Sequence, residues 1–207
     1  MKFRGYLKKT NVQEKMTEEK IRAFLQLETE MERQLLDFPE IIQGMNWGVP
    51  RFGHPEGKVV YHVLEVFNNL DSVRPSLSVQ DRQTLRIIAL LHDSFKYVED
   101  RTDPRDWSKH HSVLAADFAQ NVFSDSVIID ITRRHDDAYY CWKLFALQNQ
   151  PEQALKRLDW LMDKVGYCLQ LYYTFFVCDT DTGDKTQEPV KWFEQNIPGL
   201  QKILLIN

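Results

Sequence analysis

An apolar run of the sequence ends abruptly in a histidine and an aspartate. The letters IIALLHDSFK place His92 and Asp93 directly after the run, with Lys96 close behind. An imidazole and a carboxylate at the end of a core segment are costly unless they are paired or bound to a metal ion. The dipeptide alone carries little weight, because it recurs at His135-Asp136. Its meaning depends on the helix faces that the other histidines occupy.

Further polar side chains share this placement on apolar helix faces. His92 follows Leu85 and Ile88 at the spacing of the core-facing stripe of an amphipathic helix. The same periodicity places four more residues on apolar faces of other predicted helices: His62, His111, His135 and Asp179. A single such histidine is more often a hydrogen-bonded core residue than a ligand. Five of these side chains that could meet in one helical bundle indicate a shared partner, and a metal ion is the simplest one.

Helical periodicity dominates the chain, and no segment shows the alternation of a half-buried strand. The predicted fold class is therefore all-α. Helices are predicted over 17–38, 58–70, 107–123, 126–135, 138–148, 151–179 and 189–195, with a shorter one from Pro39. Ser78 and Asp81 form a capping-box-like start for the helix that carries His92. Residues 45–57 are rich in glycine and proline and predict a loop.

Composition and charge exclude several classes of protein. The net charge of −4 gives no electrostatic case for nucleic acid as a partner. The three cysteines lack CxxC spacing, which indicates reduced thiols in a cytoplasmic protein. The basic N-terminal segment lacks the apolar centre of a signal peptide, and the most apolar window, 167–178, is too short to span a bilayer. We therefore expect a soluble protein in the cytoplasm with no membrane partner.

The order of the candidate ligands resembles that of a known superfamily. His62, the pair His92-Asp93, and Asp179 follow one another as in the HD-domain metal-dependent phosphohydrolases. Four segments are also similar to the family: HPEGKVVYHVLEV, ALLHDSFK, HHSVLAADFA and FFVCDTDTGD. In the third segment the resemblance selects His111 over His110, because the family histidine precedes a pair of small residues by four positions.

This resemblance covers about 53–183 and implies a helical bundle with a metal site between core helices. We therefore expect a single HD-type domain over 1–207. Its parts would be an N-terminal helical extension over 1–50, an HD core over 53–183, and a C-terminal helix and tail over 184–207.

The resemblance also implies a role for each ligand. A first metal site would consist of His62, His92, Asp93 and Asp179. His111 and His135 match the extra histidines of members that hold two metals, and Asp93 would then bridge them. Asp181 is an alternative to Asp179, because both aspartates lie in one short segment.

This donor set indicates the metal and the chemistry. Imidazoles combined with carboxylates suit one or two Mn, Fe, Co or Zn ions better than Mg or Ca. Water on such an ion ionises near neutral pH. Lys96 would supply a cation for a substrate phosphate, and its alternative is a solvent-exposed lysine near a helix C-terminus.

Charged residues near the candidate ligands have two interpretations each. Arg133 and Arg134 are either phosphate-binding or solvated surface residues. Asp136 and Asp137 are either outer partners of a ligand imidazole or surface residues. Glu99 is expected to lie in a solvated acidic loop.

These interpretations favour a metal-dependent phosphohydrolase, that is, a phosphatase or phosphodiesterase that cleaves a small phosphate ester or nucleotide. Its catalytic residues would be Asp93 and Lys96. One alternative is a di-iron oxygenase of the same superfamily, which His111 and His135 support. Another is a non-catalytic HD module that binds a nucleotide. The aromatic segment Tyr167–Phe176 is consistent with a homodimer interface or with a buried core.

Overall fold

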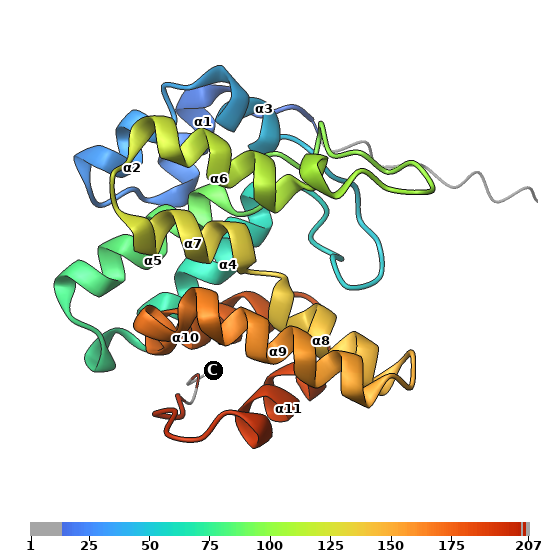
Figure 1. Ribbon diagram of the computed structural model, residues 1–207. Coiled ribbons are helices and arrows are strands. Elements are labelled where there is room, and N and C mark those ends of the chain that lie inside the picture. Colours follow the sequence, from blue (N-terminus) through green and yellow to red (C-terminus); the bar gives the residue numbers. More distant parts are fainter. Residues whose placement is uncertain (1–13, 204, 206–207) are drawn as a thin grey trace, which may run out of the picture.

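The computed structural model describes residues 14–203 and 205, and this part of the chain consists of α-helices joined by loops and short 3₁₀ turns (Figure 1). No strand is present among the described residues, which confirms the all-α class. None of the described helices is long and apolar enough to cross a membrane. The expectation for residues 1–13, that they form no signal peptide, lies outside the described residues.

The N-terminal part forms three short helices: α1 (Glu18–Leu25), α2 (Glu30–Leu35) and α3 (Pro39–Met45). The single helix predicted over 17–38 is therefore wrong. The chain leaves α1 at Gln26, whose φ of 50° is left-handed. Thr29 begins α2 by accepting a hydrogen bond from the backbone N–H of Glu32 at 3.1 Å. The Glu32 carboxylate accepts in return from the backbone N–H of Glu28 at 2.8 Å, and reciprocal capping of this kind starts a helix.

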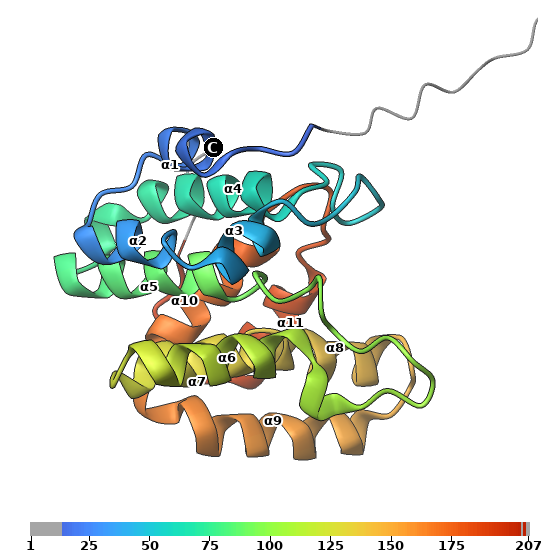
Figure 2. The same ribbon diagram turned by 90° about the horizontal axis from the view of Figure 1, so that it is seen from above.

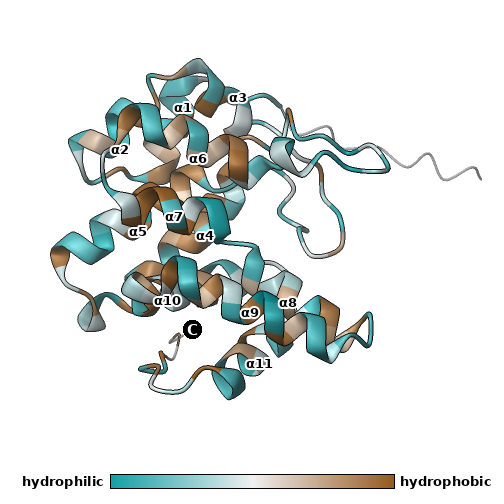
Figure 3. Ribbon diagram, in the orientation of Figure 1, coloured by the Kyte–Doolittle hydropathy of each residue, from teal (hydrophilic) through white to brown (hydrophobic). Residues whose placement is uncertain are grey.

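Three helices form the centre of the molecule: α4 (Val59–Ser72), α5 (Val79–Leu91) and α10 (Leu169–Thr180). α4 packs against α5, and α10 contacts both. Hydrophobic residues occur along α10, whereas the first turns of α5 are hydrophilic (Figure 3). α5 begins as predicted, because Ser78 Oγ accepts from the backbone N–H of Asp81 at 3.0 Å. Every α5 residue from Leu85 onward is buried, so the chain carries the following His-Asp pair into the middle of the molecule.

The remaining helices cover this centre in pairs. α6 (His111–Val122) packs against α7 (Ser126–Arg134), and α8 (Asp137–Ala146) packs against α9 (Pro151–Val165). Figure 2 shows α9 along the outside of the bundle, and α11 (Glu188–Asn196) contacts α8. The helix predicted over 107–123 begins late, because a 3₁₀ turn (Trp107–Lys109) precedes α6. A second 3₁₀ turn (Arg74–Ser76) joins α4 to α5.

The long helix predicted over 151–179 is also wrong as a single element. α9 ends at Val165, and a 3₁₀ turn (Gly166–Cys168) separates it from α10. Gly166 weakens a helix at this point, since glycine loses the most backbone freedom on folding. The break lets α10 contact α4 and α5 while α9 stays against α7 and α8. It thereby brings Asp179 to the side chain of His62 on α4.

The aromatic segment 167–176 contributes to the core. Its side chains Tyr172, Tyr173, Phe175 and Phe176 are buried, whereas Tyr167 is exposed. Tyr173 stacks on Phe193 of α11 with 6.4 Å between ring centroids. A buried core therefore accounts for these four residues, and the homodimer stays a prediction.

A buried ion pair joins α2 to α5. Arg86 Nε lies 2.9 Å from Glu32 Oε1 and its Nη2 lies 3.0 Å from Glu32 Oε2, which is the bidentate geometry of a guanidinium and a carboxylate. Both side chains are almost completely buried, at 2% and 0% exposure. The Arg86 guanidinium also lies over the ring of Phe67 at 3.7 Å.

We expect Glu32→Gln to lower the free energy of unfolding by about 3 kcal/mol, because removing one charge of a buried pair leaves the other uncompensated. Urea denaturation followed by circular dichroism measures this loss. Glu30→Gln on the same helix is the control, since Glu30 is 71% exposed and pairs with Arg33 at the surface. A surface pair contributes less than about 1 kcal/mol. Equal effects of the two substitutions would contradict the role given to the buried pair.

Candidate metal centre

The six ligands expected from the sequence come from five helices and meet in the middle of the molecule. Their side chains are buried, with exposures between 1% and 14%. His62 lies on α4, and His92 and Asp93 directly follow α5. His111 begins α6, His135 follows α7, and Asp179 lies in the last turn of α10.

A first group of ligand atoms surrounds His62. His62 Nε2 lies 2.9 Å from Asp179 Oδ1, 3.1 Å from His92 Nε2 and 3.7 Å from Asp93 Oδ2. His92 Nε2 in turn lies 3.6 Å from Asp93 Oδ2. Ligand atoms that each lie about 2.1 Å from one ion are separated by roughly 3 to 3.5 Å. The spacing of this group is therefore close to that of a metal coordination shell.

A second group of ligand atoms surrounds His111. His111 Nε2 lies 3.3 Å from His135 Nε2 and 3.4 Å from Asp93 Oδ1. Asp136 Oδ2 joins this group at 3.2 Å from His111 Nε2 and 3.5 Å from His135 Nε2. Asp93 thus presents Oδ2 to the first group and Oδ1 to the second.

The far nitrogens of His92, His135 and His111 have partners that orient the rings. His92 Nδ1 donates to the carbonyl of Ala89 at 2.9 Å, and His135 Nδ1 donates to the carbonyl of Thr132 at 2.9 Å. His111 Nδ1 lies 3.1 Å from Glu99 Oε1. Ligand histidines are held in this way, because a proton on one nitrogen leaves the lone pair of the other free for a metal.

Comparison with protein families adds one match to this geometry. Residues 59–160 match the family model of the HD domain. This chain contains an HD domain. The matched segment includes His62, His92, Asp93, His111 and His135 and ends before Asp179. The HD domain implies the superfamily of metal-dependent hydrolases, so the match confirms the resemblance seen in the sequence.

The same comparisons find no significant match among curated proteins or among solved structures. The division of the chain into extension, HD core and tail stays a prediction, since the family match covers only part of the proposed core.

The contacts of three neighbouring residues distinguish them from the candidate ligands or from their alternative interpretations. Asp181 lies outside both groups, because its Oδ1 accepts from Gln187 Nε2 at 3.0 Å. His110 also lies outside them, where its Nδ1 accepts from the backbone N–H of Ser112 and caps α6. Lys96 is only 15% exposed, and its Nζ lies 2.5 Å from Asp93 Oδ2. The interpretation of Lys96 as a solvent-exposed lysine is therefore wrong.

Two carboxylates of the site were not assigned to it from the sequence. The sequence predicts Asp136 to be either an outer partner of a ligand imidazole or a surface residue, yet its Oδ2 lies among the atoms of the second group. Glu99 was expected in a solvated loop and is instead 7% exposed beside His111. The repeated His-Asp dipeptide at His135-Asp136 was the available signal for Asp136, because a second ligand pair at a helix end repeats the arrangement after α5. No comparable signal marked Glu99.

Burial and charge shift the pKa of these groups in opposite directions. Burial lowers the pKa of His92 to about 3, so its imidazole is neutral. Burial also works to lower the pKa of His111, but the neighbouring carboxylates of Asp136, Asp93 and Glu99 outweigh it and raise the pKa to about 10. Burial favours the protonated acid of Asp93, but Lys96 outweighs it and holds the pKa of Asp93 well below its usual value. The site therefore concentrates ionised carboxylates in a buried volume.

These residues fit divalent metal ions. Asp93 Oδ1 is buried and has no hydrogen-bond partner in the described part of the chain. A buried oxygen of this kind needs another partner, and a bound cation would supply it. The described side chains also form two further groups that could hold a metal, His54-Glu56-His62 and Glu99-His110-His111. Each of these shares a histidine with one of the main groups and uses its opposite nitrogen. Glu99 is better explained as an outer partner that orients His111, while Glu56 Oε1 lies 3.7 Å from His62 Nδ1.

A cavity of about 510 Å³ opens onto the metal ligands. It reaches Asp93, His135, Asp136 and Asp179 of the two groups. Three cations line it, Arg51, Lys96 and Lys185, and an apolar wall is formed by Phe52, Tyr139, Trp142, Leu147 and Phe176. A cavity lined by cations, candidate metal ligands and aromatic side chains suits an anionic group attached to an apolar or planar body.

Proposed function

We propose that this HD domain is a phosphohydrolase, a phosphatase or phosphodiesterase that cleaves a small phosphate ester or a nucleotide. The observation that carries the proposal is the position of Asp93. Its two oxygens face two separate groups of imidazole and carboxylate ligands, and a buried lysine lies 2.5 Å away. Paired metal sites of this kind suit phosphoryl transfer, because both the attacking and the leaving oxygen need stabilisation.

Each group would hold one ion. The first ligand set is His62, His92, Asp93 Oδ2 and Asp179 Oδ1, and the second is Asp93 Oδ1, His111, His135 and Asp136 Oδ2. Mn, Fe, Co or Zn match these donors. When bound, such ions lower the pKa of water and neutralise the charge that develops on a phosphoryl group.

Lys96 would bind the phosphate of the substrate. Burial works to lower its pKa, but Asp93 and Asp136 outweigh this and raise it, so the ammonium group is charged at neutral pH. Its side chain lines the cavity that reaches the metal ligands. Arg51 and Lys185 line the same cavity and would attract the anion, while Lys185 Nζ also holds Asp179 Oδ1 at 3.0 Å.

We expect Lys96→Met to lower kcat/KM for a phosphate ester by roughly 100-fold, in the range found when one group that stabilises transition-state charge is lost. The metal content should not fall, because removing a cation beside Asp93 favours metal binding. Elemental analysis and steady-state kinetics measure the two effects. Lys109→Met is the matched control, since Lys109 is an exposed lysine that pairs with Asp106. Unchanged kinetics of the metal-loaded Lys96→Met variant would remove Lys96 from the mechanism.

The function itself is tested by elemental analysis of untreated protein, followed by activity assays with the metal found. The assays should include p-nitrophenyl phosphate, bis-p-nitrophenyl phosphate and a panel of nucleotides. If His92→Ala and Asp93→Ala abolish metal binding but leave a measured turnover intact, catalysis at this site is excluded. A nucleotide that binds without turnover in the metal-loaded protein would favour the non-catalytic module.

A di-iron oxygenase is the second candidate, and the observation that favours it is the histidine content of the second group. His111 and His135 lie 3.3 Å apart with Asp93 beside them, which completes a ligand set similar to that of superfamily members that activate O₂. Iron retained after aerobic purification, with an EPR signal of a mixed-valent pair, would support this candidate. A colourless protein with Mn-dependent hydrolase activity would exclude it.

A further inference from the structure

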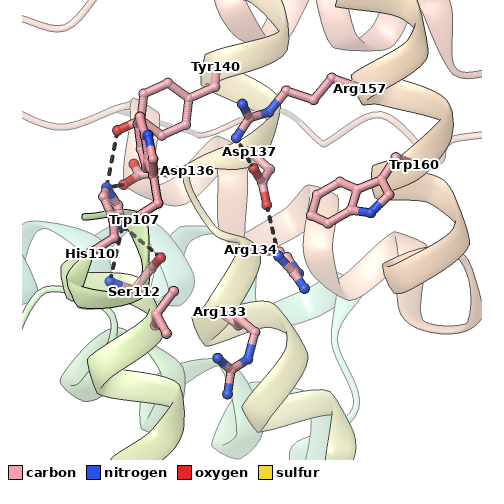
Figure 4. A pocket seen from close by; sticks show the side chains of 11 residues that line it. Trp107, His110, Ser112, Arg133, Arg134, Asp136, Asp137, Tyr140, Arg157 and Trp160 are labelled. Carbon is pink, nitrogen blue, oxygen red and sulfur yellow. Dashed lines mark hydrogen bonds and ion pairs between the residues drawn. The ribbon is translucent and has the colours of Figure 1, made fainter. Parts of the chain in front are cut away.

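A second cavity, of about 300 Å³, lies beside the metal centre (Figure 4). Asp136 lines both this cavity and the larger one. Its other walls include Trp107, Arg134, Asp137, Arg157 and Trp160. None of these five residues belongs to a ligand group of the candidate metal centre.

Two guanidinium groups in this cavity share one carboxylate. Asp137 lies between Arg134 and Arg157 (Figure 4). Arg157 Nη2 donates to Asp137 Oδ1 at 2.5 Å. Arg134 Nη1 lies 3.9 Å from Asp137 Oδ2, which is too far for a hydrogen bond. The two guanidinium groups therefore share Asp137, and Asp136, which also belongs to the second ligand group, is the other carboxylate among the lining residues.

Donors of both arginines remain unused. Within the described residues, the Arg134 guanidinium makes no hydrogen bond, and Arg157 Nε is buried without a partner. A buried donor without an acceptor is costly, and an oxyanion with several acceptor atoms would satisfy Arg157 Nε and also bind the Arg134 guanidinium, whose side chain is 24% exposed. The neighbouring Arg133 differs, because its Nη2 donates to Asp117 Oδ1 at 2.6 Å. Figure 4 shows the Arg133 guanidinium turned away from Asp137.

Aromatic rings hold the two guanidinium groups in place. The Arg134 guanidinium lies 4.4 Å from the ring centroid of Trp160, and that of Arg157 lies 5.1 Å from the ring centroid of Tyr140. Stacking on rings fixes a planar guanidinium and leaves its edge N–H groups directed outward. Trp107 and Trp160 are also exposed to solvent, so the cavity offers aromatic surface next to its cations.

We propose that this cavity binds a phosphorylated nucleoside, with the phosphate held by Arg134 and Arg157 and the base against the indole surfaces. The planar fork of a guanidinium matches the oxygens of a phosphate, and aromatic side chains stack on any base. A phosphate brings more than one negative charge and several acceptors, which a single carboxylate such as Asp137 does not supply. This cavity shares Asp136 with the candidate metal centre, but its arginines and indoles belong to neither ligand group, so the inference does not depend on the proposed function.

The test is isothermal titration calorimetry of the metal-loaded full chain with the phosphonate analogue of AMP, which a phosphohydrolase does not cleave. We expect Arg134→Gln and Arg157→Gln each to weaken binding by about tenfold or more, as charge-assisted hydrogen bonds are lost. Arg133→Gln is the matched control, with the same change in charge one residue away, and should alter binding by less than about twofold. Elemental analysis of each variant verifies that the metal centre is intact.

Two further ligands test the two halves of the proposal. Adenosine, which lacks the anion, and methylphosphonate, which lacks the base, should both bind more weakly than the analogue. Absence of binding by the analogue would overturn the proposal. Binding that Lys96→Met weakens, and that Arg134→Gln and Arg157→Gln do not, would place the ligand in the larger cavity and would equally overturn it. Methylphosphonate bound as tightly as the analogue would contradict the role of the indoles.

Discussion

Replacing Asp93 with alanine is expected to remove both metal subsites of the HD domain at once. Its Oδ2 lies 3.6 Å from His92 Nε2 and its Oδ1 lies 3.4 Å from His111 Nε2, so each ligand group loses an anionic member. Loss of an outer partner of a metal site already costs roughly 10- to 100-fold. We therefore expect kcat/KM to fall by about 10³-fold or more, with less than one ion retained per chain.

The Asp93→Ala variant should remain folded, because the substitution removes a buried carboxylate that has an unused oxygen rather than an apolar packing group. Circular dichroism verifies this, and elemental analysis measures the ions. Asp181→Ala is the matched control: it removes a carboxylate near Asp179 that contacts Gln187 and neither ligand group. Two ions retained by Asp93→Ala, with activity close to that of the unchanged protein, would contradict the bridging position.

Variants that remove a ligand from only one of the two groups distinguish the two metal subsites. His62→Ala removes the histidine at the centre of the first group, and His135→Ala removes a histidine from the second. Each should lose one ion and keep the other, because only Asp93 belongs to both groups. Loss of both ions from either variant would indicate that the two subsites fill cooperatively.

Three of the six ligands that the sequence predicted share one physical property. His62, His111 and Asp179 each lie on a helix whose core-facing stripe is set by a period of 3.6 residues, so their direction can be read from their apolar neighbours. A polar residue on such a stripe is buried wherever the helix packs. The periodicity therefore predicted which side chains meet in the core without any knowledge of how the helices are arranged.

The residues that the sequence did not place lie at breaks between helices. Asp136 lies between α7 and α8, and Glu99 lies in the loop after α5. Side-chain direction in such segments follows from local backbone angles and not from a repeat, so neither could be assigned to a face. The same limitation explains the missed breaks at Gln26 and Gly166, where short-range capping and glycine outweigh a continuous amphipathic pattern.

Asp136 and Asp137 connect the two cavities at one of these breaks. Asp136 Oδ2 lies 3.2 Å from His111 in the metal centre, while Asp137 Oδ1 lies 2.5 Å from Arg157 in the smaller cavity. Consecutive residues thus belong to the metal centre and to the proposed phosphate site. A ligand that displaces Asp137 from its arginines would act on the backbone next to a metal ligand.

Removal of metal by a chelator is expected to destabilise the protein as well as inactivate it. Asp93, Asp136 and Asp179 place three carboxylates close together, and among the described residues Lys96, Lys185 and a protonated His111 balance part of their charge. Divalent ions bind these ligands in the folded state and not as a set in the unfolded chain. Metal present at roughly 1,000 times its dissociation constant would add about 4 kcal/mol to the free energy of unfolding.

For a chain of this length such a gain corresponds to a rise in Tm of about 8 to 16 °C. Differential scanning calorimetry of chelator-treated protein, with and without added Mn or Zn, measures it. Mg should give a smaller shift, because the ligand sets contain four histidines and Mg prefers oxygen donors. Asp93→Ala is the control, and its Tm should not respond to Mn or Zn. If the unchanged protein also melts at one temperature with and without these ions, the ligand groups are a hydrogen-bonded core and not a metal centre.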